Sequence, residues 1–133
     1  MRTLLPSHEL FSAGLCALDG APADPLAVAL MREVGIDIAS HRSRRLASWM
    51  LAEASFVYTM EAAQAAWLRK RHPSHAQKIA RLGDACGADI PDPHGQARAA
   101  FEQSYAAIRR AVQSRLPTWL ALSGTPLASS LPA

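Results

Sequence analysis

The sequence predicts an α/β fold, in which helices cover both faces of a parallel sheet to give three layers. Segments typical of strands and of helices alternate along the chain, as in βαβ units. Half of the 133 residues are hydrophobic, enough to build the core of one domain. We expect residues 1–117 to form this domain. Residues 118–133 end in a run rich in Ser, Pro, Ala and Gly, and we expect them to form a disordered tail.

Four segments are predicted to be helices. The first starts at Asp24-Pro25, because Asp is a favourable N-cap and Pro suits the first helical position. Apolar residues then recur at helical spacing from 26 to 34, and Gly35 ends the helix. The other three helices are predicted at about 44–53, at 61–71 before Pro73, and at about 97–116 before Pro117.

Three segments are predicted to be strands: Glu9–Ser12, Ser55–Met60 and Gln77–Leu82. The second is apolar and β-prone, which is typical of a buried strand. Three strands are few for a sheet covered on both faces, and no helix precedes the first of them. We therefore expect that part of the fold is missing at the amino end.

One carboxylate, Asp92, stands between two prolines in the loop Ile90–Gly95. Each proline fixes its own φ and restricts the residue before it, so Asp92 is held stiffly. A rigid carboxylate at the mouth of an α/β fold suits proton donation to a leaving group. The alternative is that Asp92 caps a helix or closes a turn.

The composition argues against several classes of protein. Cys16 and Cys86 lack the paired spacing of zinc ligands and suit a reducing cytoplasm, so neither a metal nor a disulfide is expected. No apolar run approaches the ~20 residues of a membrane span. The net charge is +3, with basic clusters at 42–45 and 69–72, but no nucleic-acid motif accompanies them. We expect these clusters to be solvated helix faces or ends.

The order and spacing of several short motifs resemble the low-molecular-weight protein tyrosine phosphatases, from Phe11 to about Leu116. The matching segments are Ser12-Ala13-Gly14, Ala23-Asp24-Pro25, Gly35–Ile38, His41–Leu46, Thr59-Met60-Glu61, Ile90–Pro93, and Phe101 with Tyr105. Ser12–Leu15 followed by Ala17-Leu18 is most similar to the bacterial branch that dephosphorylates tyrosine kinases of exopolysaccharide export.

The resemblance implies a phosphotyrosine phosphatase I fold, no cofactor, a cytoplasmic location, and a phosphotyrosine protein such as that kinase as partner. It also implies a phosphocysteine mechanism, in which a Cys-x5-Arg loop supplies the nucleophile and holds the phosphoryl oxygens. Asp92 would then protonate the leaving phenol oxygen, while Leu15, Leu18 and His94 would line the substrate cleft. The family often has an aromatic residue in place of His94.

No Cys-x5-Arg loop is present in this chain. The sixth residue after Cys16 is Pro22, and the sixth after Cys86 is Asp92. We expect that the first, central strand and its phosphate loop are missing, and that the chain is truncated and inactive alone. It could associate with itself through the open sheet edge. The alternative is a catalytically dead phosphatase-like binding module; the arsenate-reductase branch of the same fold would need further cysteines.

Overall fold

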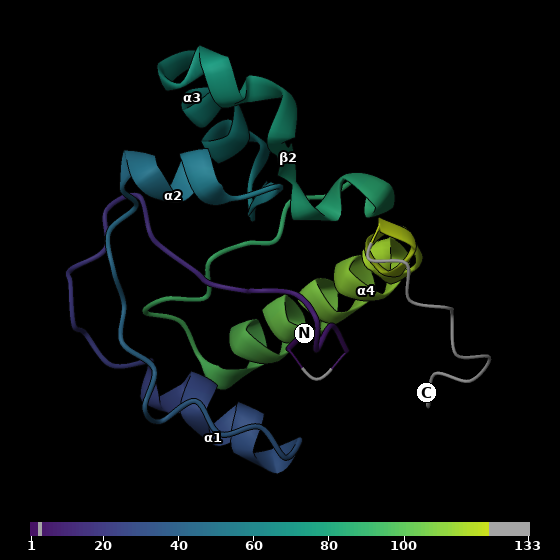
Figure 1. The fold of residues 1–133 in the computed structure, drawn as a ribbon. Helices are drawn as coiled ribbons and strands as arrows, with labels where there is room; N and C mark the ends of the chain where they lie inside the picture. Colours follow the sequence, from purple (N-terminus) through teal and green to yellow (C-terminus); the bar gives the residue numbers. More distant parts are fainter. Residues whose placement is uncertain (3, 123–133) are drawn as a thin grey trace.

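The computed structural model describes residues 1–2 and 4–122. Its elements follow one another around a short parallel sheet (Figure 1). The helices are α1 (Pro25–Glu33), α2 (Ser48–Glu53), α3 (Ala62–Arg71) and α4 (Arg98–Leu122); the strands are β1 (Val57–Thr59) and β2 (Ile79–Arg81); the short 3₁₀ helices are η1 (Pro73–Lys78) and η2 (Leu82–Cys86).

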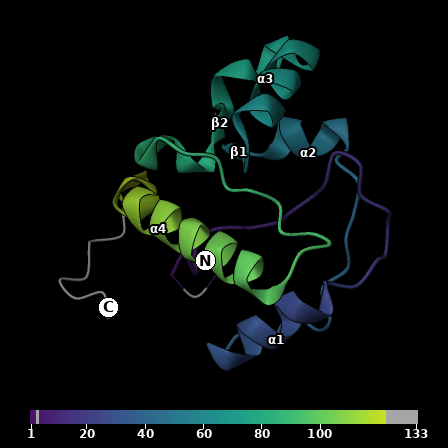
Figure 2. The same cartoon turned by 180° about the vertical axis from the view of Figure 1, so that it is seen from behind.

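The sheet and its crossover helix lie at one end of the fold (Figure 1). Strands β1 and β2 pair in parallel, with Tyr58 opposite Ala80, and α3 provides the crossover between them. Viewed from both sides, α2 and α3 lie together beyond one side of the strands, α4 lies on the other, and α1 lies past the first turn of α4 (Figure 2). This confirms the predicted α/β class with a parallel sheet.

Two of the predicted helices begin within one residue of the predicted position, and each has a local N-terminal cap. The carboxylate of Asp24 accepts a hydrogen bond of 2.8 Å from the Leu26 N–H, which is the predicted N-cap of α1. Helix α3 begins with a capping box, in which Glu61 and Gln64 bind each other's backbone N–H groups. The predicted strands at 55–60 and 77–82 are also present, shortened to β1 and β2.

Two apolar clusters hold the layers together. The larger joins α4 to η2 and to the amino-terminal turn; its buried members are Leu5, Leu82, Ile90, Ala111, Val112, Leu116 and Trp119. The smaller joins α3 to β2 and consists of Ala65, Leu68 and Ile79. The amino-terminal turn is therefore part of the main core.

The predicted strand Glu9–Ser12 is wrong, because these residues are irregular in the structure. A strand needs a neighbour that pairs with its backbone, and the described residues provide no ladder for this segment. Two guanidinium groups bind its carbonyl groups instead: Arg2 donates to the Leu10 oxygen at 2.9 Å, and Arg44 donates to the Ser12 oxygen at 3.1 Å.

The predicted helix at 44–53 begins only at Ser48. The residues before it are extended, because their backbone pairs with distant residues. Gly14 donates to the Arg44 carbonyl and accepts from the Leu46 N–H, each at 2.9 Å. Ser43 donates to the Ala21 carbonyl at 2.8 Å. These tertiary hydrogen bonds override the local helical preference.

The prediction that the last helix ends at Pro117 is also wrong, since α4 continues to Leu122. Proline removes one helical hydrogen bond, at a cost of about 3 kcal/mol in a helix interior. The turn beyond it carries Trp119, which is 5 % exposed and belongs to the main core. Burial of this side chain offsets the cost. Of the predicted tail, residues 118–122 are thus helical, and residues 123–133 lie outside the described residues.

We expect Gly83→Ala to destabilise the domain by about 1–3 kcal/mol or more, because the site cannot hold a side chain. Gly83 is buried in η2, and a Cβ atom there would lie 2.1 Å from the Ala88 carbonyl oxygen. Urea denaturation would measure the loss. Ala85→Ser, at an exposed neighbouring position, is the control and should change the midpoint little.

Candidate active-site loop

The loop that carries Asp92 is anchored at two points on the fold. The Ile90 side chain is buried in the main core, and its N–H donates to the Met60 carbonyl at 2.9 Å, just after β1 ends. The buried Ser104 of α4 donates its hydroxyl to the Pro91 carbonyl at 2.8 Å. The loop is therefore held between the carboxyl end of β1 and the first half of α4.

Asp92 itself is exposed and closes a tight turn. Its carboxylate accepts the His94 N–H at 3.0 Å, and its carbonyl accepts from the Gln96 side chain at 3.1 Å. Gly95 adopts a φ of 73°, which favours glycine. Helix α4 starts only at Arg98, so Asp92 does not cap it. Within residues 1–2 and 4–122, the hydrogen bonds to this carboxylate use one oxygen, and the second oxygen could serve as a proton donor.

Asp89 fixes the start of the same loop. One of its oxygens accepts from the Ala62 N–H at 2.9 Å, at the start of α3, and from Arg81 at 2.8 Å, at the end of β2. Arg81 also contacts Asp84 at 2.9 Å. The hydrogen bond from Arg81, followed by that from Ala62, holds the pKa of Asp89 below its ordinary value.

Asp89→Asn should lower stability at neutral pH, and this difference should shrink in acid. A carboxyl whose pKa is depressed by folding stabilises the native state above its unfolded pKa, and this contribution is lost as pH falls through the folded pKa. The unfolding free energies of wild type and variant should therefore converge below pH about 4. Urea denaturation at a series of pH values measures the two unfolding free energies. Asp37→Asn is a control, because no ion pair involves Asp37 among residues 1–2 and 4–122. A pH-independent difference would contradict the prediction.

The other predicted cleft residues do not gather with Asp92 in one pocket. Leu15 is half-buried and packs against the α3–β2 cluster. Leu18 is 77 % exposed, and His94 is also exposed. Leu15 lines a hollow of about 260 Å³, but neither Leu18, His94 nor Asp92 does.

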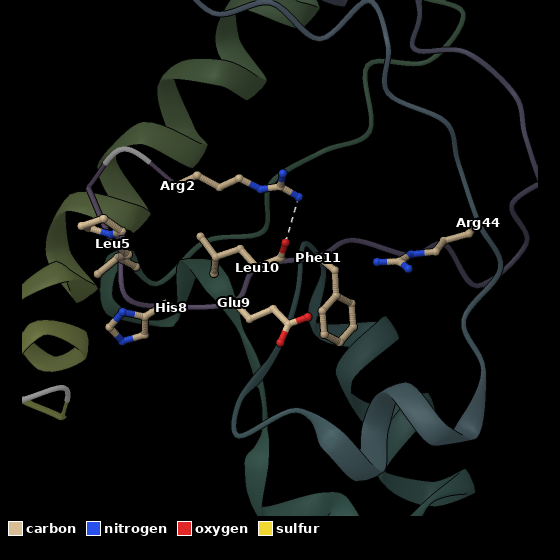
Figure 3. Close-up of a pocket in the computed structure, with 8 residues that line it drawn as sticks. Arg2, Leu5, His8, Glu9, Leu10, Phe11 and Arg44 are labelled. Atoms are coloured by element: carbon tan, nitrogen blue, oxygen red, sulfur yellow. Dashed lines mark hydrogen bonds between the residues drawn. The ribbon is translucent and has the colours of Figure 1, made fainter.

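A second hollow, of about 460 Å³, lies along the irregular segment that was predicted to be a strand (Figure 3). Arg2 and Arg44 approach this segment from opposite ends, and the Arg44 guanidinium lies 5.1 Å from the centre of the Phe11 ring. The sequence predicted Arg44 only as part of a solvated basic cluster and did not single out Arg2. The carbonyl groups that they bind lie 32 and 8 positions away, respectively. The role of both arginines here is to satisfy backbone groups.

Both cysteines are exposed and free. Within the described residues, no three His, Cys, Asp or Glu side chains are grouped to hold a metal ion. In the same part of the chain, no helix is long and apolar enough to cross a membrane.

The parallel strands β1 and β2, the crossover helix α3 and the Asp92 loop beside the carboxyl end of β1 define an α/β domain with an exposed carboxylate at the edge of its sheet. The family model for low molecular weight phosphotyrosine protein phosphatase matches residues 2–122, so this chain belongs to that family. The family prediction is thereby confirmed. Proteins of this family hydrolyse phosphotyrosine.

Curated relatives agree with the family assignment. The chain is 39 % identical over 122 residues to a probable low molecular weight protein-tyrosine-phosphatase, EpsP, of Ralstonia solanacearum, covering 92 % of this chain and 84 % of EpsP. It is 30 % identical to the phosphatase Wzb of Salmonella typhi, covering 91 % of this chain and 82 % of that relative.

Solved structures share the fold. Wzb of Vibrio vulnificus, in complex with benzylphosphonate, superposes with a TM-score of 0.82 at 31 % identity, covering 88 % of this chain and 84 % of that one. The YwlE arginine phosphatase of Geobacillus stearothermophilus superposes with a TM-score of 0.79 at 25 % identity, covering 96 % and 85 %.

Proposed function

We propose that this chain is the part of a protein-phosphotyrosine hydrolase that supplies the general acid, Asp92. The observation that carries this proposal is the double anchoring of the Asp92 loop, by Ile90 to the end of β1 and by Ser104 to α4. This anchoring leaves an exposed, conformationally restricted carboxylate just beyond the carboxyl end of a parallel strand. Ligand sites of α/β sheets commonly lie at that edge.

A general acid must reach the oxygen of the leaving group at hydrogen-bond distance. The Asx turn formed with His94 fixes one oxygen of Asp92. The other oxygen would carry the proton to the phenol oxygen of tyrosine. Leu15, Leu18 and His94 are proposed to contact the substrate ring.

The 133-residue chain is proposed to be inactive alone, because neither Cys16 nor Cys86 is followed by arginine at the sixth position. A nucleophilic thiolate without this arginine has no charged partner for the phosphoryl oxygens. We also propose that the first, central strand of the family sheet and its phosphate loop are not part of this chain. The two-stranded sheet of the described residues supports this proposal.

An open sheet edge would allow a second copy of the chain to pair with the first. The exposed aromatic Phe56, directly before β1, supports such self-association, since it is 49 % exposed.

The proposed substrate is a phosphotyrosine protein, such as a tyrosine kinase of exopolysaccharide export, in the cytoplasm. The names of the bacterial relatives EpsP and Wzb support a protein-tyrosine substrate.

The purified chain should show no turnover of p-nitrophenyl phosphate above a buffer blank at any pH between about 5 and 8, the range in which general acids and bases of enzymes operate. Absorbance of released nitrophenolate measures this, with a full-length phosphatase such as Wzb as positive control. Vanadate-sensitive turnover would contradict the proposal of inactivity. Retention of a folded monomer that binds phosphotyrosine peptide without hydrolysis would instead support the binding-module alternative.

A further inference from the structure

The smaller hollow combines an exposed indole with basic side chains from two distant parts of the sequence. Trp67, Arg71 and His72 come from α3 and its carboxyl end. Arg45 and Leu46 come from the extended segment before α2. We call this feature the basic–aromatic hollow; its volume is about 260 Å³.

Trp67 presents a large apolar surface to solvent. Its side chain is 50 % exposed, and the Arg71 guanidinium lies 5.5 Å from the centre of the ring. Trp49 is exposed to a similar extent, 52 %, but it does not line this hollow. Exposed indole and guanidinium groups are also the side chains most often found at the energetic centres of interfaces.

Among the described residues, no carboxylate forms an ion pair with Arg45 or Arg71, although the Asp19 carboxylate accepts the Arg45 backbone N–H at 2.7 Å. No carboxylate is among the lining residues of the hollow. Within the part of the chain that the structure describes, the arginines in ion pairs are Arg81 and Arg98, and neither lines the hollow. Arg71 also stabilises the carboxyl end of α3 through the helix dipole, but this accounts neither for Arg45 nor for the exposed indole.

We propose that the basic–aromatic hollow binds an acidic peptide segment of a partner protein, one that presents an apolar or aromatic side chain between carboxylates. The apolar side chain would pack on Trp67. The flanking carboxylates would pair with Arg45 and Arg71, whose planar guanidinium groups match carboxylates in shape and charge. A nucleic acid is less well matched, because backbone-tracking sites need longer rows of cations. Leu15, which is proposed to contact the substrate ring, also lines this hollow. The peptide site uses Arg45, Arg71 and Trp67 and needs neither Asp92 nor catalysis, so it goes beyond the proposed function.

Fluorescence anisotropy of the full chain with a fluorescein-labelled peptide, Glu-Asp-Leu-Tyr-Asp-Glu, tests this proposal at low salt. The double variant Arg45→Glu/Arg71→Glu should raise Kd at least about tenfold, through lost attraction and added repulsion. Trp67→Ala should also raise Kd several-fold. The matched control Arg109→Glu/Arg110→Glu makes the same charge change on an exposed face of α4 and should shift Kd by less than about twofold.

Equal losses in the two double variants would overturn the proposal, since binding would then follow net charge alone. Unchanged binding by Trp67→Ala would overturn it too, and so would displacement of the peptide by a short DNA duplex at lower concentration than by unlabelled peptide. Circular dichroism checks folding, and Arg45→Gln/Arg71→Gln replaces the first variant if that one is unfolded. No phosphatase activity is measured, so failure here is distinct from failure of the proposed function.

Discussion

Trp119→Ala is expected to lower the free energy of unfolding by about 3–5 kcal/mol, as for other large aromatic side chains removed from a core. Trp119 is 5 % exposed and packs in the main core with Leu5 and Leu116. Its ring meets that of Tyr58 edge-on, with centroids 5.5 Å apart, and its Nε1–H donates to the Tyr58 hydroxyl at 3.1 Å. A domain of this size has only about 5–15 kcal/mol of stability in total, so the variant would be near unfolding.

Two controls separate packing from hydrogen bonding in this prediction. Trp119→Phe keeps most of the apolar volume and removes the donor, and should cost less than Trp119→Ala. Leu122→Ala, at a side chain that is 62 % exposed, should leave the unfolding midpoint nearly unchanged. Urea denaturation followed by circular dichroism measures all three. If Trp119→Ala costs under about 1 kcal/mol, the α4 turn beyond Pro117 is not held by the core as described.

Predictions from local chemistry succeeded where the deciding contacts lie within a few residues. The Asp24 carboxylate caps α1 two residues later in the chain, so the start of that helix could be predicted from two adjacent residues. The turn at Asp92 also depends on an acceptor and a donor two positions apart; the sequence offered it only as the alternative to a proton donor. The parallel arrangement of β1 and β2 followed from the helical segment between them.

The errors fall where distant residues decide. Whether Glu9–Ser12 forms a strand depends on a neighbouring strand that its own pattern cannot reveal. The extended backbone at Arg44 depends on Gly14, 30 positions away. The helix beyond Pro117 depends on burial of Trp119 against Tyr58, which is 61 positions away. Arg45 and Trp67 are 22 positions apart in the sequence and line the same hollow only in the folded chain. Their positions in the sequence therefore did not predict this hollow.

Asp92→Asn is expected to reduce the turnover number by about 10²–10⁴-fold in a form of this domain that carries a nucleophile. We propose to make such a form by fusing to residue 1 of this chain the segment of Wzb from Vibrio vulnificus that carries the Cys-x5-Arg loop implied by the family resemblance. The TM-score of 0.82 to that structure indicates that the two backbones are compatible. We expect the fusion protein to hydrolyse p-nitrophenyl phosphate.

The identity of the leaving group provides the decisive measurement. Phenolate is a poor leaving group, since phenols of the tyrosine type have a pKa near 10, whereas nitrophenolate leaves more readily. A lost general acid should therefore slow hydrolysis of phenyl phosphate more than that of p-nitrophenyl phosphate. Asp37→Asn in the same fusion is the matched control, because Asp37 is also exposed and its carboxylate also accepts the N–H two residues later, that of Ala39 at 2.9 Å. An equal loss for both substrates would show that Asp92 only shapes its loop, through the turn with His94, and donates no proton.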